Sequence, residues 1–508
     1  MKRPVRVRFA PSPTGGLHLG GVRTALYNYL FARKHGGTFI LRVEDTDRNR
    51  FVAGAEAYIL QCLEWCGLMP DESPQSGGAF GPYRQSERRH LYAQYARQLV
   101  DAGHAYYAFD TPEELAQMRA ENPNAQYDHT TRGQMRNSLS LPQAEVATLL
   151  EKETPHVIRI KMPGSQTIHL KDIIRGEIAF DAGLVDDKVL LKADGMPTYH
   201  LAVVVDDYLM QVSHAFRGEE WLPSAPVHVL LWEYLGWKEQ MPEWAHLPLI
   251  LKPDGHGKLS KRDGQRLGFP VCALDWTDPN TGETAPGFRE RGFLPGAFVN
   301  MLALLGWNDG TTQEIFSLEA LVQAFSLERV HKAGARFDFE KAKWFNHQYI
   351  QQTDDDTLAQ LAQPFLAQQG VHPDTALLRQ VVPLIKERCP LLTDFWEQGH
   401  FLFRAPEKID VKAIREKWND AVQQFFTRWI AEIEKMTDWS EEKAEQQFNA
   451  LLISRGMKKG EVLLPFRIML TGGKYGPGVF QIAGVIGREE TGRRLLRGLA
   501  SVGTETQA

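Results

Sequence analysis

The spacing of apolar residues in the first hundred positions predicts alternating strands and helices. The run VRVRFA (5–10) reads as a strand, the turn PSPTGGLHLGG (11–21) follows it, and VRTALYNYLFARKHG (22–36) has helical spacing. A second strand, TFILRVED (38–45), comes next. This order is typical of a parallel α/β unit, whose ligands bind at the carboxyl ends of the strands. We therefore predict a Rossmann-like nucleotide domain.

The pattern changes between about Tyr106 and Val185. Polar helices and short strands occur here, in the runs PEELAQMRAENPN, HVIRIKMPG and IHLKDIIRGEIAF, and the α/β pattern resumes at VLLKADG. We interpret residues 106–185 as an inserted α+β domain within a Rossmann-like domain formed by residues 1–105 and 186–260.

From roughly Pro295 onward, helical periodicity dominates. FVNMLALLGW, LEALVQAF, DTLAQLAQPFLAQQ and AVQQFFTRWIAEIEKM all repeat apolar residues every three or four positions. We predict a separate all-helical half without strands. The Pro/Gly/Thr-rich run from Thr277 to Gly287 is expected to be an exposed loop.

Composition sets the class of protein. The 508-residue chain is 43% hydrophobic and 24% charged, as ordinary globular proteins are, and its length predicts more than one domain. It contains no uncharged apolar run of about 18 residues, and the basic start of the chain lacks the apolar segment of a signal peptide. We expect a cytoplasmic protein without a membrane partner.

The four cysteines are too few and too scattered for a disulfide framework. Cys62 and Cys66 lie four positions apart in an apolar, helix-like run, which is the spacing of half a zinc site. No second pair follows nearby, so we interpret them as thiols packed in a core.

The formal net charge of −5 neither supports nor excludes an RNA partner. Basic residues nevertheless outnumber acidic ones near the C-terminus, which is as typical of a solvated face as of a phosphate-binding one. These residues are Arg455, Lys458, Lys459, Arg467, Lys474, Arg488, Arg493, Arg494 and Arg497.

Two segments carry candidate phosphate chemistry. In the turn from Pro11 to Gly21, glycines let backbone N–H groups approach anionic oxygens, and His18 can stabilise charge on a phosphate. In the segment Lys258 to Arg262 (KLSKR), three cations can close over a polyphosphate. Taken singly, the first is also a plausible structural turn and the second a plausible solvated surface.

Together, these segments resemble the two signature motifs of class I aminoacyl-tRNA synthetases, the HIGH and KMSKS elements. Five linked blocks, the first of which contains the HIGH-like turn, are similar to the bacterial glutamyl-tRNA synthetase family: RFAPSPTGGLHLG (8–20), GGTFILRVEDTDRNR (36–50), GPYRQSERRHLY (81–92), DGMPTYHLAVVVDD (194–207) and FRGEEWL (216–222). The resemblance covers nearly the whole chain, strongly to about Trp307. Beyond it, residues 329–350 and 472–490 resemble the two ends of the family's anticodon-reading helices.

The resemblance implies an α/β Rossmann-like class I synthetase catalytic domain with an inserted α+β domain, followed by an all-α C-terminal anticodon-binding half. In this interpretation residues 106–185 bind the tRNA acceptor end. Residues 261–335 carry the KLSKR loop and a helical region that contacts the tRNA stem. Residues 336–508 form the anticodon-binding domain.

The implied activity is that of a glutamate–tRNA ligase using ATP with Mg²⁺. Its implied partners are tRNA-Glu, with tRNA-Gln left open, L-glutamate and ATP, and the family expectation is a monomer. Catalytic roles fall on His18, Lys258 and Lys261. ATP-binding roles fall on Pro11, Ser12, Thr14, Gly15, Gly20, Glu220, Trp221 and Ser260, and glutamate-binding roles on Arg8, Ser12, Glu44, Tyr199 and Arg217.

Charge supports glutamate as the substrate. A buried carboxylate needs cationic partners, and the planar fork of arginine binds carboxylates well, so Arg8 and Arg217 are expected to receive the side-chain carboxylate. Glutamine would leave an arginine without its counter-charge. We expect His200 and His214 to be structural.

The chain departs from the family pattern at several points. Ala108 and Asp110 stand where some members carry zinc-binding cysteines, so no zinc and no other bound metal is predicted. Gly21 stands where the HIGH motif has its second histidine, and residues 265–288 form an additional segment without an assigned role.

Three other classes of protein are alternatives. A glutaminyl-tRNA synthetase is expected to have β-barrels in the half where helices are predicted here, and a tRNA-modifying glutamyl transferase lacks that half. A non-catalytic tRNA-binding paralogue would be free to lose His18, Lys258 and Lys261, which are intact.

Overall fold

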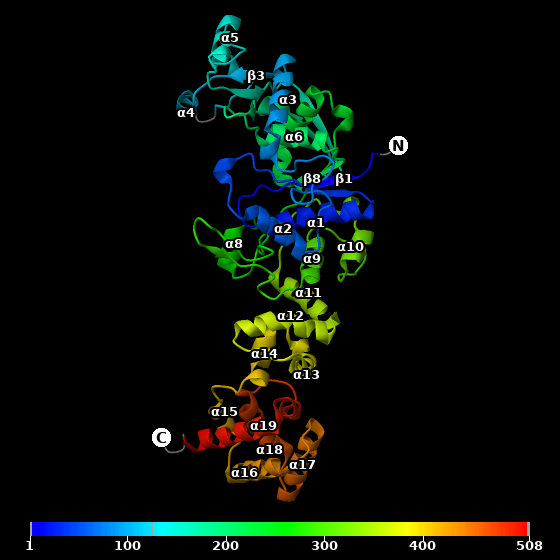
Figure 1. Cartoon of the computed structure of the whole chain (residues 1–508), viewed down its shortest axis with the longest axis vertical. Coiled ribbons are helices and arrows are strands. Elements are labelled where there is room, and N and C mark those ends of the chain that lie inside the picture. Colours follow the sequence, from blue (N-terminus) through cyan, green and yellow to red (C-terminus); the bar gives the residue numbers. More distant parts are fainter. Residues whose placement is uncertain (1–2, 123–124, 505–508) are drawn as a thin grey trace. The chain divides into compact units, whose positions relative to one another are not determined.

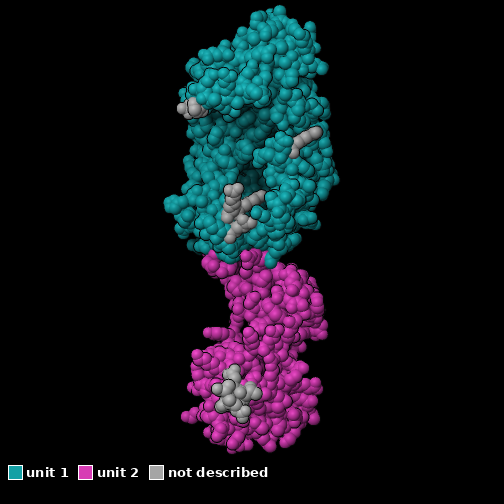
Figure 2. Space-filling model, turned by 90° about the vertical axis from the view of Figure 1, so that its left-hand side faces the viewer, with its two compact units in different colours: residues 1–290, 298–339 teal, residues 291–297, 340–508 magenta. Residues whose placement is uncertain are grey.

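The computed structural model describes residues 3–122 and 125–504, without the side chains of Arg48, Lys261, Arg262, Gln265 and Thr504. The chain forms two compact units, Met1–Glu290 with Phe298–Phe339, and Arg291–Ala297 with Glu340–Ala508. Figure 1 traces the chain, and Figure 2 shows the first unit in teal and the second in magenta.

The predicted N-terminal α/β unit is confirmed. β1 (Arg6–Phe9) and β2 (Thr38–Leu41) are parallel, and α1 (Leu19–Lys34) connects them. β8 (His214–Gly218) lies beside β1 (Figure 1), since the N–H of Ser213 donates to the carbonyl of Arg6, and it pairs in parallel with β9 (Glu243–Leu247). The strands point the same way, so their carboxyl ends gather candidate residues at one edge.

Further strands and helices of the first unit flank this sheet. β5 and β6 pair with each other, β5 joins β9 at Asp172, and β4 pairs with β3 and β7. A sheet thus crosses position 185, and the proposed boundaries of an inserted domain stay a prediction. The elements are α2 (Ala55–Trp65), α3 (Arg89–Asp101), β3 (Ala105–Ala108), α4 (Pro112–Glu121), α5 (Gln143–Glu151), β4 (Val157–Ile160), β5 (Thr167–Asp172), β6 (Gly176–Asp181), β7 (Val189–Leu191), α6 (Tyr199–Leu209), α7 (Ala225–Tyr234) and β10 (Ile250–Leu251).

The segment after residue 260 corrects two expectations. The prediction of no strands beyond Pro295 is wrong at β13 (Ala335–Arg336), which pairs in parallel with β10; the N–H groups of Ala335 and Phe337 bond to carbonyls some 85 positions earlier, a partnership that local periodicity does not encode. Residues 277–287 are mostly exposed, as predicted, but β11 (Trp276–Thr277) and β12 (Thr284–Ala285) make them a hairpin. The helices here are α8 (Lys261–Leu267), α9 (Pro295–Leu304) and α10 (Leu318–Ala324).

Helices build the second unit, as predicted. In α16 the buried residues recur every three or four positions, so one face packs into a core that includes Trp429, Phe448 and Phe466. The helices are α11 (Phe339–Gln352), α12 (Asp355–Gln368), α13 (Thr375–Ile385), α14 (Asp394–Phe403), α15 (Val411–Arg415), α16 (Asp420–Lys435), α17 (Glu441–Arg455), α18 (Lys459–Thr471) and α19 (Val479–Thr504), the last bent at Gly487.

Part of the C-terminal basic run serves a purpose that the sequence did not suggest. Arg494 is buried and donates to the carbonyls of Phe401 and Leu470, near the ends of α14 and α18. Burial lowers its pKa to about 10, with Arg493 and Arg497 adding to the effect. Arg497 likewise donates to the carbonyl of Pro406. Both guanidinium groups satisfy backbone carbonyls. Buried Arg494 is therefore neither part of a solvated face nor open to phosphate, whereas Arg497 stays exposed.

All four cysteines are buried thiols, and Cys62 lies on α2 with Cys66 at its end, which confirms the core interpretation. Among the described residues, no helix is both long and apolar enough to cross a membrane. Nor does this part of the chain bring three or more His, Cys, Asp or Glu side chains together as metal ligands.

Candidate active site

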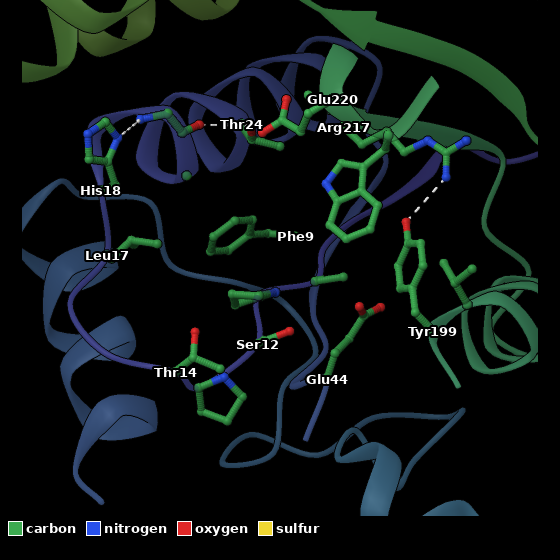
Figure 3. Close-up of a pocket in the computed structure, with 18 of the residues that line it drawn as sticks. Phe9, Ser12, Thr14, Leu17, His18, Thr24, Glu44, Tyr199, Arg217 and Glu220 are labelled. Carbon is green, nitrogen blue, oxygen red and sulfur yellow. Dashed lines mark hydrogen bonds between the residues drawn. The ribbon is translucent and has the colours of Figure 1, made fainter. Parts of the chain in front are cut away.

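A pocket of about 830 Å³ opens where β1, β2 and β8 end. In Figure 3, Arg217 and Tyr199 lie at one end, His18 lies at the other, and Ser12, Thr14 and Glu44 lie between them. Thirteen of the predicted site residues line this pocket: Arg8, Pro11, Ser12, Thr14, His18, Gly20, Glu44, Tyr199, Arg217, Glu220, Trp221, Lys258 and Ser260. Gly15 does not line it, and the side chain of Lys261 lies outside the described residues.

The glycine-rich turn sets His18 at the start of α1. Gly15 has a φ of 125°, a backbone conformation that glycine adopts readily. His18 is the N-cap, and its Nδ1 accepts a hydrogen bond of 3.2 Å from the N–H of Gly20. A neutral His18 ring that accepts at Nδ1 carries its proton on Nε2. The helix N-terminus and this imidazole together suit an anionic group.

Lys258, a predicted catalytic residue, and Glu220, a predicted ATP-binding residue, meet at the pocket rim. Lys258 Nζ lies 2.6 Å from Glu220 Oε1, and the lysine side chain is about half exposed. Ser260 caps α8, where Asp263 Oδ2 accepts from both the N–H and the hydroxyl of Ser260. These bonds from Ser260 lower the pKa of Asp263 to about 2. Asp263 therefore stays ionised at the start of the helix that follows the loop.

A buried charge cluster holds Arg8 and Glu44. Asp207 Oδ1 accepts from Arg8 Nε at 3.0 Å and from Arg42 Nη1 at 2.7 Å, and Arg42 Nη2 donates to Glu44 Oε1 at 3.1 Å. Burial alone would raise the pKa of Asp207, but Arg8 and Arg42 outweigh it and the pKa is lowered. For Glu44 burial wins over Arg42 and Arg8, and the pKa is raised. Arg8 thus reaches the pocket already paired with a carboxylate.

Arg217 differs from Arg8 because its hydrogen-bond partners are neutral. Its Nε donates to His246 Nε2 at 2.9 Å, and its Nη1 contacts His228 Nδ1 at 2.9 Å and the Tyr199 hydroxyl at 3.2 Å. Its Nη2 is shielded from solvent and has no hydrogen-bond partner among the described residues. No carboxylate there forms an ion pair with it, and burial lowers its pKa. The guanidinium is held in place with a charge that no described residue neutralises directly.

Sequence reasoning found Tyr199 but missed three other buried residues around Arg217, namely Asp172, His228 and His246. His228 and His246 are fully buried, Asp172 Oδ2 lies 2.6 Å from His246 Nδ1, and His200 Nδ1 lies 3.2 Å from His228 Nε2. Burial, with Arg217 adding to it, holds the pKa of His228 well below its usual range. The available signal was the isolated histidine in each of two apolar runs, APVHVLLW and EWAHLPLI, because a polar group among apolar residues needs a partner.

Comparisons with known proteins agree with this geometry. Residues 4–344 match the family described as "tRNA synthetases class I (E and Q), catalytic domain", and residues 357–499 match "Anticodon binding domain". A glutamate–tRNA ligase of Porphyromonas gingivalis is 52% identical over 504 residues, covering 99% of both chains. One of Phocaeicola vulgatus is 52% identical over 98% of both. The crystal structure of a glutamate–tRNA ligase from Elizabethkingia meningosepticum, described as in complex with its amino acid, superimposes with a TM-score of 0.93 at 49% identity, covering 98% of this chain and 99% of that one.

Proposed function

The chain belongs to the glutamate–tRNA ligase family of class I aminoacyl-tRNA synthetases, and we propose that it activates L-glutamate with ATP and esterifies it to the 3′-terminal adenosine of tRNA-Glu. One observation carries the choice of amino acid: Arg217 is buried, charged and without a carboxylate partner among the described residues. A buried charge without a counter-charge is costly, and a substrate carboxylate would supply it.

In this proposal the glutamate side chain lies at the Arg217 end of the pocket. Arg217, Tyr199 and Arg8 receive the side-chain carboxylate, while Ser12 and Glu44 hold the head group. The Glu44 carboxylate suits the substrate ammonium, since an opposite charge nearby favours its ionised form. Glutamine would offer an uncharged amide to the same guanidinium, which is why discrimination is expected.

ATP occupies the His18 end, and the lining residues assigned to bind it are Pro11, Ser12, Thr14, Gly20, Glu220, Trp221 and Ser260. We assign catalytic roles to His18, Lys258 and Lys261, which stabilise charge on the phosphates. Mg²⁺ enters as part of the ATP complex, because magnesium is commonly held by substrate phosphates rather than by an all-protein cage. No step requires a zinc ion.

The reaction has two steps. The α-carboxylate oxygen of glutamate bonds to the α-phosphorus of ATP while the bond to the β-phosphate oxygen breaks, which gives glutamyl adenylate and pyrophosphate. The 2′-hydroxyl of the terminal adenosine, the class I position, then attacks the adenylate carbonyl, and AMP leaves with the electron pair of the broken C–O bond. Precise placement of the two substrates and charge stabilisation account for the chemistry.

The tRNA is the third substrate. Residues 357–499 match an anticodon-binding domain, which supports a tRNA partner that is selected by its anticodon. How the domain recognises the anticodon decides whether tRNA-Gln is also a substrate. We propose that the protein acts as a monomer.

The decisive experiment is to charge purified tRNA-Glu and tRNA-Gln with labelled glutamate and, in parallel, labelled glutamine, in the presence of ATP and Mg²⁺. Glutamate on tRNA-Glu alone would establish a discriminating ligase, and glutamate on both a non-discriminating one. Transfer of glutamine would contradict the role given to Arg217. Folded protein that binds tRNA but transfers neither amino acid would be a non-catalytic paralogue.

A further inference from the structure

Three neighbouring strands present a row of buried polar side chains behind the pocket. Arg217 on β8 and His246 on β9 are paired positions of one sheet, and Asp172 ends β5, the next strand along. Arg217 Nε donates to His246 Nε2 at 2.9 Å, and His246 Nδ1 donates to Asp172 Oδ2 at 2.6 Å. All three are at most 5% exposed. The row ends in the pocket at Arg217, while Asp172 does not line the pocket.

The hydrogen bonds fix the protonation of His246. An arginine Nε–H can only donate, so His246 Nε2 must be the unprotonated nitrogen of a neutral ring. The proton then lies on Nδ1, where Asp172 accepts it; the same carboxylate also accepts from the backbone N–H groups of His246, Ile174 and Arg175. Burial lowers the pKa of His246 despite the bond to Asp172, which favours the neutral ring. Asp172 therefore orients an imidazole whose lone pair faces Arg217.

We propose that Asp172 and His246 are positioning residues for amino-acid recognition, which hold Arg217 by a neutral acceptor so that its charge stays available to the substrate carboxylate. The inference rests on the proposed function of Arg217. A carboxylate placed directly against Arg217 would hold it as firmly but would also neutralise it, as Asp207 does for Arg8. A neutral imidazole between the Asp172 carboxylate and Arg217 holds the guanidinium in place without neutralising its charge. The ring of Trp244, 4.4 Å from the guanidinium, completes the support.

Two substitutions of His246 separate the two bonds of its ring. In His246→Gln the amide oxygen takes the place of Nε2 and can accept from Arg217, whereas in His246→Asn the amide takes the place of Nδ1 and can reach only Asp172. We expect the KM for glutamate to stay within about threefold of wild type in His246→Gln and to rise about 10- to 100-fold in His246→Asn, as for a charged donor left without an acceptor. The KM for ATP should stay unchanged in both.

The measurements are KM values for glutamate and ATP in pyrophosphate exchange with tRNA-Glu present, and the dissociation constant of L-glutamate by calorimetry. A merely structural role for His246 predicts equal effects, or a milder effect in His246→Asn, because that variant keeps the bond to Asp172. Either of those results would overturn the inference.

Asp172→Asn tests the other end of the row. The amide N–H of the new side chain can donate to His246 Nδ1, and the ring proton then moves to Nε2. There it faces the Arg217 Nε–H, so the hydrogen bond between His246 and Arg217 is lost. The matched control is Asp187→Asn, another fully buried carboxylate of the same unit, which accepts from Tyr106 and the N–H of Met162 but has no bond to the row. We expect weaker glutamate binding in Asp172→Asn alone. Equal binding in the two folded variants would overturn the inference, and the His246 pair decides the matter if Asp172→Asn does not fold.

These outcomes are separable from failure of the proposed function. If wild-type protein charges tRNA with glutamate and Arg217→Ala does not, the function stands whatever the His246 variants do. If wild-type protein fails to use glutamate, the function itself is wrong, and with it the inference.

Discussion

The two ends of the active-site pocket are built in different ways. At the carboxylate end Arg217 is 5% exposed, and three of its N–H groups already have protein acceptors. At the phosphate end the Lys258 side chain is 53% exposed and bonded to one partner, Glu220, that is itself exposed. The guanidinium at the first end is already held by protein hydrogen bonds, whereas Lys258 at the second end is a long, half-exposed side chain at the rim.

The two ends also differ in charge. Arg217 has no carboxylate partner among the described residues, while Lys258 has one. A substrate carboxylate therefore adds a missing partner at one end, but a phosphate must replace Glu220 at the other. We infer that the carboxylate end provides selection through pre-organisation, and the phosphate end provides charge stabilisation that develops as substrates bind and react.

The largest effect is expected from Arg217→Ala. Loss of the buried charge should lower kcat/KM for glutamate by about 10³-fold, equivalent to roughly 4 kcal/mol, because the substrate carboxylate loses the guanidinium that has no carboxylate partner among the described residues. The KM for ATP should change little, and pyrophosphate-exchange kinetics measure both. Arg132→Ala, which breaks an ion pair with buried Asp187 outside the pocket, is the control for general destabilisation. Unchanged glutamate kinetics in Arg217→Ala would remove that residue from the site.

Lys258→Ala should have a smaller effect of a different kind. Removal of one cation near the phosphates is expected to lower kcat by about 10- to 100-fold, with the KM for glutamate nearly constant. Lys238 is a suitable control, since it is exposed and also pairs with a glutamate, Glu233, but does not line the pocket. A rise in the KM for glutamate in Lys258→Ala would show that the two ends are not independent.

Local patterns were enough to predict much of this site. The turn at 11–21 places His18, Ser12 and Gly20 by its position between a strand and a helix, which needs only neighbouring residues. The same reasoning found the amphipathic helices of the second unit, whose periodicity is also local. The roles of Glu44 and Arg217 came instead from the resemblance to a known family.

The partners of Arg217 were beyond such reasoning. Asp172 and His246 are 74 positions apart, and nothing near either residue indicates that β5 joins β9 beside β8. β13 and the carbonyls that accept from Arg494 were not predicted for the same reason. Which residues donate and accept across a sheet is decided by its strand order, and strand order is a tertiary property.

Acid should lower the free energy of unfolding, because the carboxylate end of the pocket contains buried neutral imidazoles. Burial, with Lys188 adding to it, lowers the pKa of His200 to about 4 from its ordinary 6.5. Between these values the unfolded chain binds a proton that the folded chain does not, so the free energy of unfolding falls as pH falls from about 6.5 to about 4. At pH 5 the loss from this group is about 2 kcal/mol.

His200→Asn isolates this contribution, because the amide oxygen can still accept from His228 but does not titrate. Thermal unfolding at pH 7 and pH 5 should show a smaller drop in Tm for the variant than for wild type. Equal drops would mean that His200 is not the titrating group.

The smallest effect is expected at the helix that follows the KLSKR loop. Asp263→Ala removes the carboxylate that accepts from the N–H and hydroxyl of Ser260, and with it the capping box at the start of α8. Because α8 begins directly after Ser260, the loop should be less well held, and the KM for ATP should rise by about two- to fivefold in pyrophosphate exchange. Glutamate kinetics should not change.

The matched control is Asp354→Ala, which removes the N-cap of α12 in the second unit. If both variants raise the KM for ATP equally, the effect is general destabilisation; an effect of Asp263→Ala alone would show that the order of the loop limits how the phosphate end receives its substrate.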